Sequence, residues 1–86
     1  ELGSSPRTRE AYLRDLALLA TWASTRHRVS GAAALEAAHL REWVYEQKDQ
    51  GRAATTIKRR ISALRTWYRF LLAEGVVKAD PSEKLE

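Results

Sequence analysis

The stretch from Thr55 to Leu72 most constrains how this chain can fold, because its apolar residues recur at the spacing of one helix face. At about 100° per residue, a single arc holds Ile57, Ile61, Leu64, Tyr68, Leu71 and Leu72. Such a stripe is typical of a helix that packs against a core. The sequence therefore predicts a helix over residues 54–73 with one buried side.

The opposite arc of this helix is polar and basic, and it holds Thr55, Lys58, Arg59, Ser62, Thr66 and Arg69. No acidic residue lies between Arg52 and Ala73. Cations neutralise phosphates, and short hydroxyl side chains let a nucleic-acid backbone come close. Surface helices more often mix both signs, since opposite charges four residues apart support each other. The pattern favours nucleic-acid binding and a solvated basic helix about equally. Arg60 and Arg65 flank the apolar arc, so we expect them to serve packing or helix ends more than DNA.

Two further helices are predicted before this one. Ser5-Pro6 opens a helix over 6–26, since Ser caps free amides and Pro suits the first helical position. Gly51 ends a second helix over 37–50. Asp80-Pro81-Ser82-Glu83 has the pattern of a capping box, so a truncated fourth helix is expected to start near 81. The expected core consists of Tyr12, Leu16, Leu19, Leu40, Trp43, Val44, Ile57, Ile61, Leu64, Tyr68 and Leu71.

Composition sets the class of protein. The 86 residues suit one small all-α domain, and a net charge of +4 suits an acidic partner without proving one. The chain has no cysteine, which excludes a disulfide framework and a zinc finger. No apolar run approaches the ~18 residues that span a membrane, and no signal peptide is evident, so a cytoplasmic location is expected.

The sequence carries no visible catalytic constellation. It has no Gly-rich phosphate loop, nucleophile elbow or zinc-protease motif. His27 and His39 have no cysteine or carboxylate at ligand spacing, so we expect no metal site and no cofactor.

Several motifs along the chain form a pattern together. They are Thr8-x-x-x-Tyr12-x-x-Asp15-Leu16, Gly51, Thr56-Ile57-x-Arg59-Arg60-Ile61-Ser62-Ala63-Leu64-Arg65, Tyr68-x-Phe70-Leu71, Gly75 and Asp80-Pro81. This pattern resembles the N-terminal core-binding domain of tyrosine recombinases, the family of phage integrases and Xer-type site-specific recombinases. The resemblance covers residues 5–85, and the block from Thr56 to Leu71 is its most specific part.

The resemblance implies a SAM-like bundle of orthogonally packed helical hairpins that forms one jaw of a clamp on double-stranded DNA. It implies that the N-terminal end of the first helix and the exposed face of the third helix approach the major groove and its flanking phosphates. The contact candidates that it marks are Arg7, Thr8, Thr55, Lys58, Arg59 and Ser62, to which the polar arc adds Thr66 and Arg69. The family's catalytic residues lie in a C-terminal domain that is absent from this chain. We therefore expect a fragment that binds DNA as a monomer without cutting it, from a protein that works as a tetramer on DNA.

Two positions depart from the family pattern. Ala53 and Ala37 stand where the third and second helices usually have a capping residue, which predicts weaker helix starts.

A small helical protein-interaction module is the competing function, since fold does not fix function. Leu18, Trp22, Trp67 and Phe70 lie outside the core arcs and could form its surface. Salt-dependent binding to duplex DNA would separate the two functions.

Overall fold

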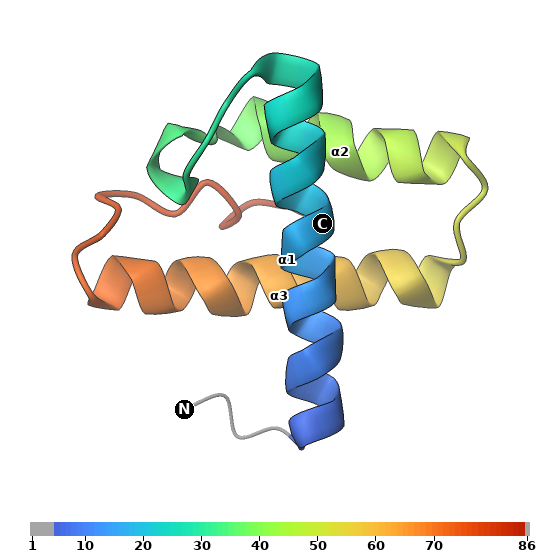
Figure 1. Ribbon diagram of the computed structural model, residues 1–86, viewed down its shortest axis with the longest axis horizontal. Coiled ribbons are helices and arrows are strands. Elements are labelled where there is room, and N and C mark those ends of the chain that lie inside the picture. Colours follow the sequence, from blue (N-terminus) through green and yellow to red (C-terminus); the bar gives the residue numbers. More distant parts are fainter. Residues whose placement is uncertain (1–4, 86) are drawn as a thin grey trace.

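The computed structural model describes residues 5–85, which form three α-helices and one short 3-10 helix. The helices are α1 (Pro6–His27), α2 (Ala37–Asp49) and α3 (Ala54–Ala73), and the 3-10 helix η1 spans Ala32–Ala34. In Figure 1, α2 and α3 lie side by side with opposite directions, and α1 runs across both. This arrangement confirms the predicted all-α fold, and the predicted helix bounds agree to within a residue.

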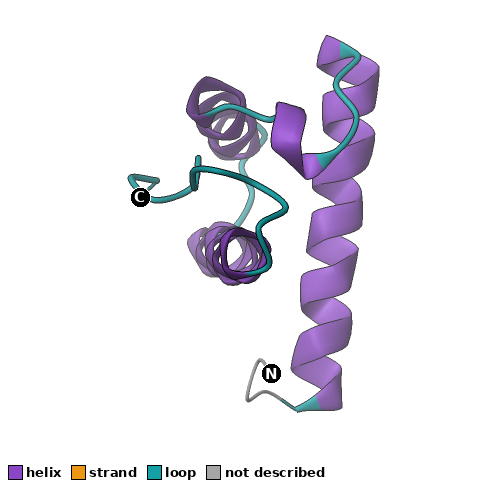
Figure 2. Cartoon of the chain, turned by 90° about the vertical axis from the view of Figure 1, so that its left-hand side faces the viewer, coloured by secondary structure: helices purple, strands orange, loops and turns teal. Residues whose placement is uncertain are grey.

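In the molecule α1 lies on one face of the α2–α3 pair, and the segment after α3 runs between these two helices. Figure 2 shows α2 and α3 end-on beside α1, with the final segment passing between them and ending on the side away from α1. Val77 and Leu85 are buried in the core, whereas Val76 is 56% exposed. The chain closes the core on this side because two apolar side chains anchor an irregular segment.

The helix expected to start near residue 81 does not form, and residues 81–84 make a turn instead. A carboxylate oxygen of Asp80 accepts hydrogen bonds from the Ser82 amide at 2.8 Å and the Ser82 hydroxyl at 2.6 Å. Asp80 therefore acts as a cap, as expected, but the element that it caps is a turn.

Local contacts explain where the helices begin and end. The Ser5 hydroxyl accepts a hydrogen bond from the Thr8 amide at 3.2 Å, as expected for the cap of α1. Glu36 precedes α2, and its amide donates to His39 Nδ1 at 3.0 Å, so the expectation of an uncapped start at Ala37 is wrong. Ala53 does leave α3 without a side-chain cap. Gly51 has a φ of 76°, the left-handed conformation that ends many helices.

The core is built from the predicted stripes. Leu19, Leu40, Leu64 and Tyr68 are fully buried, and nine of the eleven expected core residues belong to the buried cluster. The other two, Tyr12 and Leu16, are half-buried. Leu72 is 42% exposed, so its assignment to the buried arc of α3 is wrong. It lies in the last turn of α3, beyond the crossing with α1.

Tyr68 links α3 to η1. Its side chain is fully buried, and its hydroxyl donates a hydrogen bond to the carbonyl of Ala32 at 2.9 Å. Burial, helped by the negative charge of Asp80, raises the pKa of Tyr68 from 10.0 to about 12. The folded state therefore holds this proton more tightly than the unfolded state does.

This pKa shift predicts a loss of stability at alkaline pH. Below pH 10 both states keep the proton, so Tyr68 adds no pH dependence there. Between pH 10 and about 12 only the unfolded state releases it, and the free energy of unfolding should fall by up to ~1.4 kcal/mol per pH unit. Denaturation curves of the parent and Tyr68→Phe across this range measure the effect. An identical pH slope in both proteins would contradict the assignment.

Candidate nucleic-acid interface

The outer face of the first half of α3 is exposed and basic. Thr55, Lys58, Arg59 and Ser62 are all exposed, and α3 as a whole carries five basic residues and no acidic one. Among residues 5–85, no carboxylate pairs with Lys58. This face presents long cations beside short hydroxyl side chains, as the polar arc predicted.

The N-terminal end of α1 projects past α3 in both ribbon views (Figures 1 and 2). Arg7 is exposed there, and Thr8 is half-buried with its hydroxyl oxygen 3.0 Å from that of Ser5. Thr8 and Asp15 are seven residues apart, so they share one side of α1. The side of α1 that begins at Thr8 therefore leads to Asp15, which contacts α3.

Asp15 joins α1 to α3 through a bidentate ion pair with Arg59. Arg59 Nε donates to Asp15 Oδ2 at 2.9 Å, and Arg59 Nη2 donates to Asp15 Oδ1 at 3.0 Å. The Asp15 side chain is only 2% exposed, whereas that of Arg59 is 43% exposed. The hydrogen bonds that Arg59 donates to Asp15 also raise the pKa of Arg59. Arg59 thus reaches the surface, as expected, but it is anchored to a buried carboxylate that the helical pattern alone did not pair with it.

Arg60 binds the same carboxylate from within. Its Nε donates to Asp15 Oδ1 at 3.1 Å, and its Nη1 donates to Gln47 Oε1 at 2.6 Å. Gln47 lies on α2 and is buried, so this network connects all three helices. Arg65 donates to the carbonyl of Leu85 in the final segment. The expectation that Arg60 and Arg65 serve packing is confirmed.

The remaining two site candidates lie apart from the Lys58–Arg59 surface. Thr66 is half-buried in an apolar groove of about 300 Å³ between α1 and the second half of α3, lined by Tyr12, Leu13, Trp67 and Phe70 among others. Arg69 lines a separate depression shared with the final segment, near Asp80 and Glu83. The polar arc therefore divides into a basic first half and a second half with different neighbours.

Two acidic residues of α2, Glu42 and Glu46, are paired with basic side chains of α1. Arg26 Nη1 lies 2.8 Å from Glu46 Oε2, and His27 Nε2 lies 2.9 Å from Glu42 Oε1. Trp22 Nε1 also donates to Glu46 at 3.2 Å. These contacts place negative charge at the α1–α2 contact, so the outer face of α3 remains basic.

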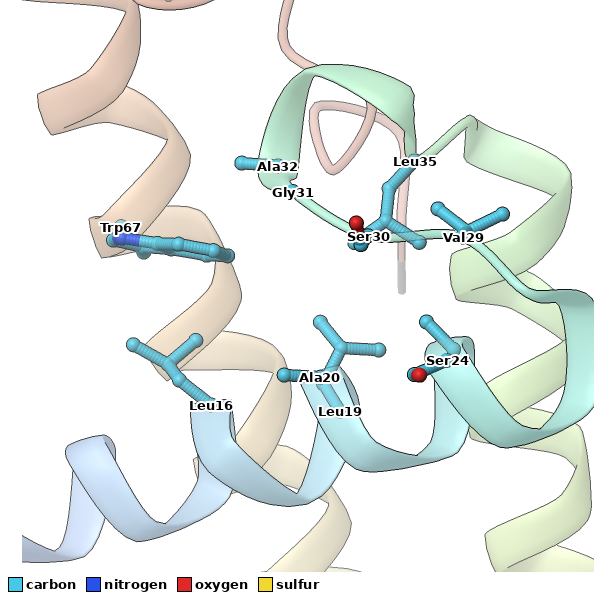
Figure 3. Close-up of a pocket in the computed structure, with 11 residues that line it drawn as sticks. Leu16, Leu19, Ala20, Ser24, Val29, Ser30, Gly31, Ala32, Leu35 and Trp67 are labelled. Atoms are coloured by element: carbon cyan, nitrogen blue, oxygen red, sulfur yellow. The ribbon is translucent and has the colours of Figure 1, made fainter.

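A second apolar cavity of about 140 Å³ lies under the segment that joins α1 to η1. Figure 3 shows its lining from α1, the 29–35 segment and Trp67 of α3. None of its lining residues is titratable. Across residues 5–85 no cluster of three or more histidine, cysteine or acidic side chains could hold a metal. Within the same residues, no helix combines the length and apolar character that a membrane span needs.

Asp15 is the residue of the candidate site that sequence reasoning left without a role. It appeared only as part of a motif, although the stripe of Tyr12, Leu16 and Leu19 already placed it toward the core. An acid on a buried stripe needs a cationic partner, and that requirement was the available signal.

Comparison with known proteins places the chain in a family. Residues 1–75 match the family described as phage integrase, N-terminal SAM-like domain. The chain is 37% identical to the tyrosine recombinase XerC of Xanthomonas axonopodis pv. citri, over 94% of this chain and 30% of that protein. It is 35% identical to the tyrosine recombinase XerC of a Mycobacterium species, over 100% of this chain and 29% of that protein.

The chain thus spans less than a third of the length of these relatives. No solved structure gives a significant match. The family match covers more than half of the chain and includes α1, α2 and α3, which together supply the basic face and the Asp15 network. The chain belongs to the family of phage-integrase N-terminal SAM-like domains.

Proposed function

We propose that this domain binds double-stranded DNA and forms one jaw of a clamp in a site-specific tyrosine recombinase. A separate catalytic domain would carry out strand exchange, and this domain would hold the duplex without cutting it. The family and the recombinase names of the relatives support a role in recombination. The observation that carries the proposal is the exposed basic face of α3, on which Lys58 has no carboxylate partner among residues 5–85 and Arg59 stays 43% exposed beside Asp15.

The contacts proposed for this function fall into two groups. Arg7 and Thr8 would reach the duplex from the projecting end of α1, and Lys58, Arg59 and Ser62 from the outer face of α3. The ion pair between Asp15 and Arg59 joins α1 to α3, so it would hold the contacts from α1 and those from α3 in a fixed relative position. Thr55 would contribute from the first turn of α3, whereas Thr66 and Arg69 would contribute least, since their neighbours lie in other depressions.

The isolated domain should bind duplex DNA weakly and with strong salt dependence. One jaw lacks the gain that a tethered second domain adds, so we expect a Kd on the order of micromolar or weaker. Three phosphate contacts predict a salt slope near −2.7, or about fortyfold weaker binding between about 50 and about 200 mM salt. Fluorescence anisotropy with a labelled duplex measures both quantities. Tight binding that ignores salt over this range would rule out the electrostatic mechanism.

A pair of charge-matched variants locates the surface. Lys58→Ala should weaken binding to every duplex and flatten the salt slope by about one unit, the value for one lost phosphate contact. Lys48→Ala removes the same charge from α2, where Lys48 lies beside Lys84 and Leu85 of the final segment. It should change binding much less. Equal effects of both variants would mean that only net charge matters and that α3 does not dock on DNA.

Protein binding is the second candidate function, because the groove of Thr66 has an exposed apolar rim. Leu13 is 67% exposed and Phe70 is 54% exposed, whereas Trp22 and Trp67 pack partly against the core. Phe70→Ser should leave DNA binding unchanged if the basic face is the functional one. Loss of a protein partner with intact DNA binding would show that the domain has both surfaces.

A further inference from the structure

The Asp15 network is more than a neutral salt bridge. One carboxylate accepts three hydrogen bonds from two guanidinium groups, two from Arg59 and one from Arg60. The three side chains together keep a net charge of +1. Arg60 is enclosed, with only 14% of its side chain exposed, so Arg59 is the member that carries this charge to the surface.

The hydrogen bonds fix how Arg59 is presented. A guanidinium group has five N–H donors in one plane. Asp15 takes one from Nε and one from Nη2, which leaves both donors of Nη1 and one of Nη2. One hydrogen of Nη1 and the free hydrogen of Nη2 point outward side by side, and they form the outer edge, which binds phosphate or the acceptor atoms of guanine in pairs. The buried carboxylate of Asp15 thus fixes the orientation of the Arg59 guanidinium group from its inner side.

We propose that Asp15 is a positioning residue for DNA binding, and that it holds the outer edge of Arg59 toward acceptor atoms of the duplex. The inference rests on the proposed function, since it assigns to a buried acid a role in that same surface. A long arginine side chain normally loses its freedom when it binds. Here Asp15 orders Arg59 before DNA arrives, and Arg60 and Gln47 order Asp15 in turn.

The proposal predicts a result opposite to that of simple electrostatics. Asp15→Asn removes a negative charge at nearly constant shape and raises the net charge from +4 to +5. Long-range attraction alone would tighten DNA binding, whereas loss of positioning should weaken it by about tenfold, the equivalent of one good contact. Asp49→Asn, at the exposed last residue of α2, makes the same charge change outside the Asp15 network and should bind at least as well as the parent.

A second variant changes the guanidinium group of Arg59 and leaves Asp15 in place. Arg59→Lys keeps the charge, but a single ammonium group cannot donate to Asp15 on one side and to DNA on the other as the planar guanidinium can. It should therefore weaken DNA binding about tenfold with an unchanged salt slope. Asp15→Asn combined with Arg59→Lys should bind like Arg59→Lys alone, because both changes remove one contact. Tyr68→Phe removes a core hydrogen bond outside this network, and it should lower the melting temperature while binding stays within about twofold.

Anisotropy titrations and thermal melts of these variants decide the matter. A loss that is uniform across duplex sequences assigns the Arg59 contact to phosphate, and a loss confined to particular sequences assigns it to a base edge. The proposal is overturned if Arg59→Lys binds like the parent, or if Tyr68→Phe weakens binding as much as Asp15→Asn does at an equal loss of melting temperature. If Lys58→Ala still weakens binding in that case, the proposed function stands alone. If the parent shows no salt-dependent binding, the function and the inference fail together.

Discussion

Replacing Asp15 with Ala should lower the free energy of unfolding by about 3–5 kcal/mol, a large share of what a domain of this size has. The reason is the charge that remains. Arg60 is 14% exposed and would keep its guanidinium in the interior with only Gln47 as a partner. Removing one member of a buried ion pair costs more than the pair contributes, because an uncompensated charge is left behind.

The matched control is Arg59→Ala, which should cost only about 1–2 kcal/mol. Asp15 would keep its hydrogen bond from Arg60, and Arg59 itself is 43% exposed, so water screens much of the lost attraction. Urea denaturation of both variants measures the difference. Equal costs would mean that the carboxylate depends on Arg59 rather than on Arg60. On the helical pattern alone, Arg59 points away from the apolar stripe, and its removal should leave stability nearly unchanged. Its contact with Asp15 predicts a measurable cost instead.

The helices could be predicted because each depends on short-range signals. Apolar spacing located α3 to the residue, and Ser5, Pro6 and Gly51 marked the ends of α1 and α2 by local chemistry. The end of α1 shows where such signals stop. Arg28 takes the left-handed conformation there, with a φ of 55°, and its amide donates to the Ser24 carbonyl at 3.1 Å. No glycine marks this position, so the sequence could place the helix end only approximately.

The candidate site could be predicted only in part, because a helical wheel relates residues of one helix to its own axis. It placed Lys58 and Arg59 on the exposed side correctly. It could not show that Asp15, 44 positions earlier on α1, contacts Arg59. It also treated Thr66 as equivalent to Ser62, whereas α1 forms a groove wall beside only the second half of α3. Long-range neighbours therefore decide which part of the polar arc remains exposed and basic.

Leu64→Ala should be the most damaging of the single apolar substitutions on α3, at about 2–5 kcal/mol. Leu64 is fully buried in the cluster that all three helices share, so truncation leaves a cavity that rigid neighbours cannot close. Leu72→Ala is the matched control, because the apolar spacing put both leucines on one arc while the structure exposes 42% of Leu72. We expect Leu72→Ala to cost less than about 1 kcal/mol, since a surface site loses little contact. Thermal or urea unfolding of the two variants compares them directly. If they lost similar stability, α3 would be rotated about its axis relative to this structure, and the surface that carries Lys58 and Arg59 would turn with it.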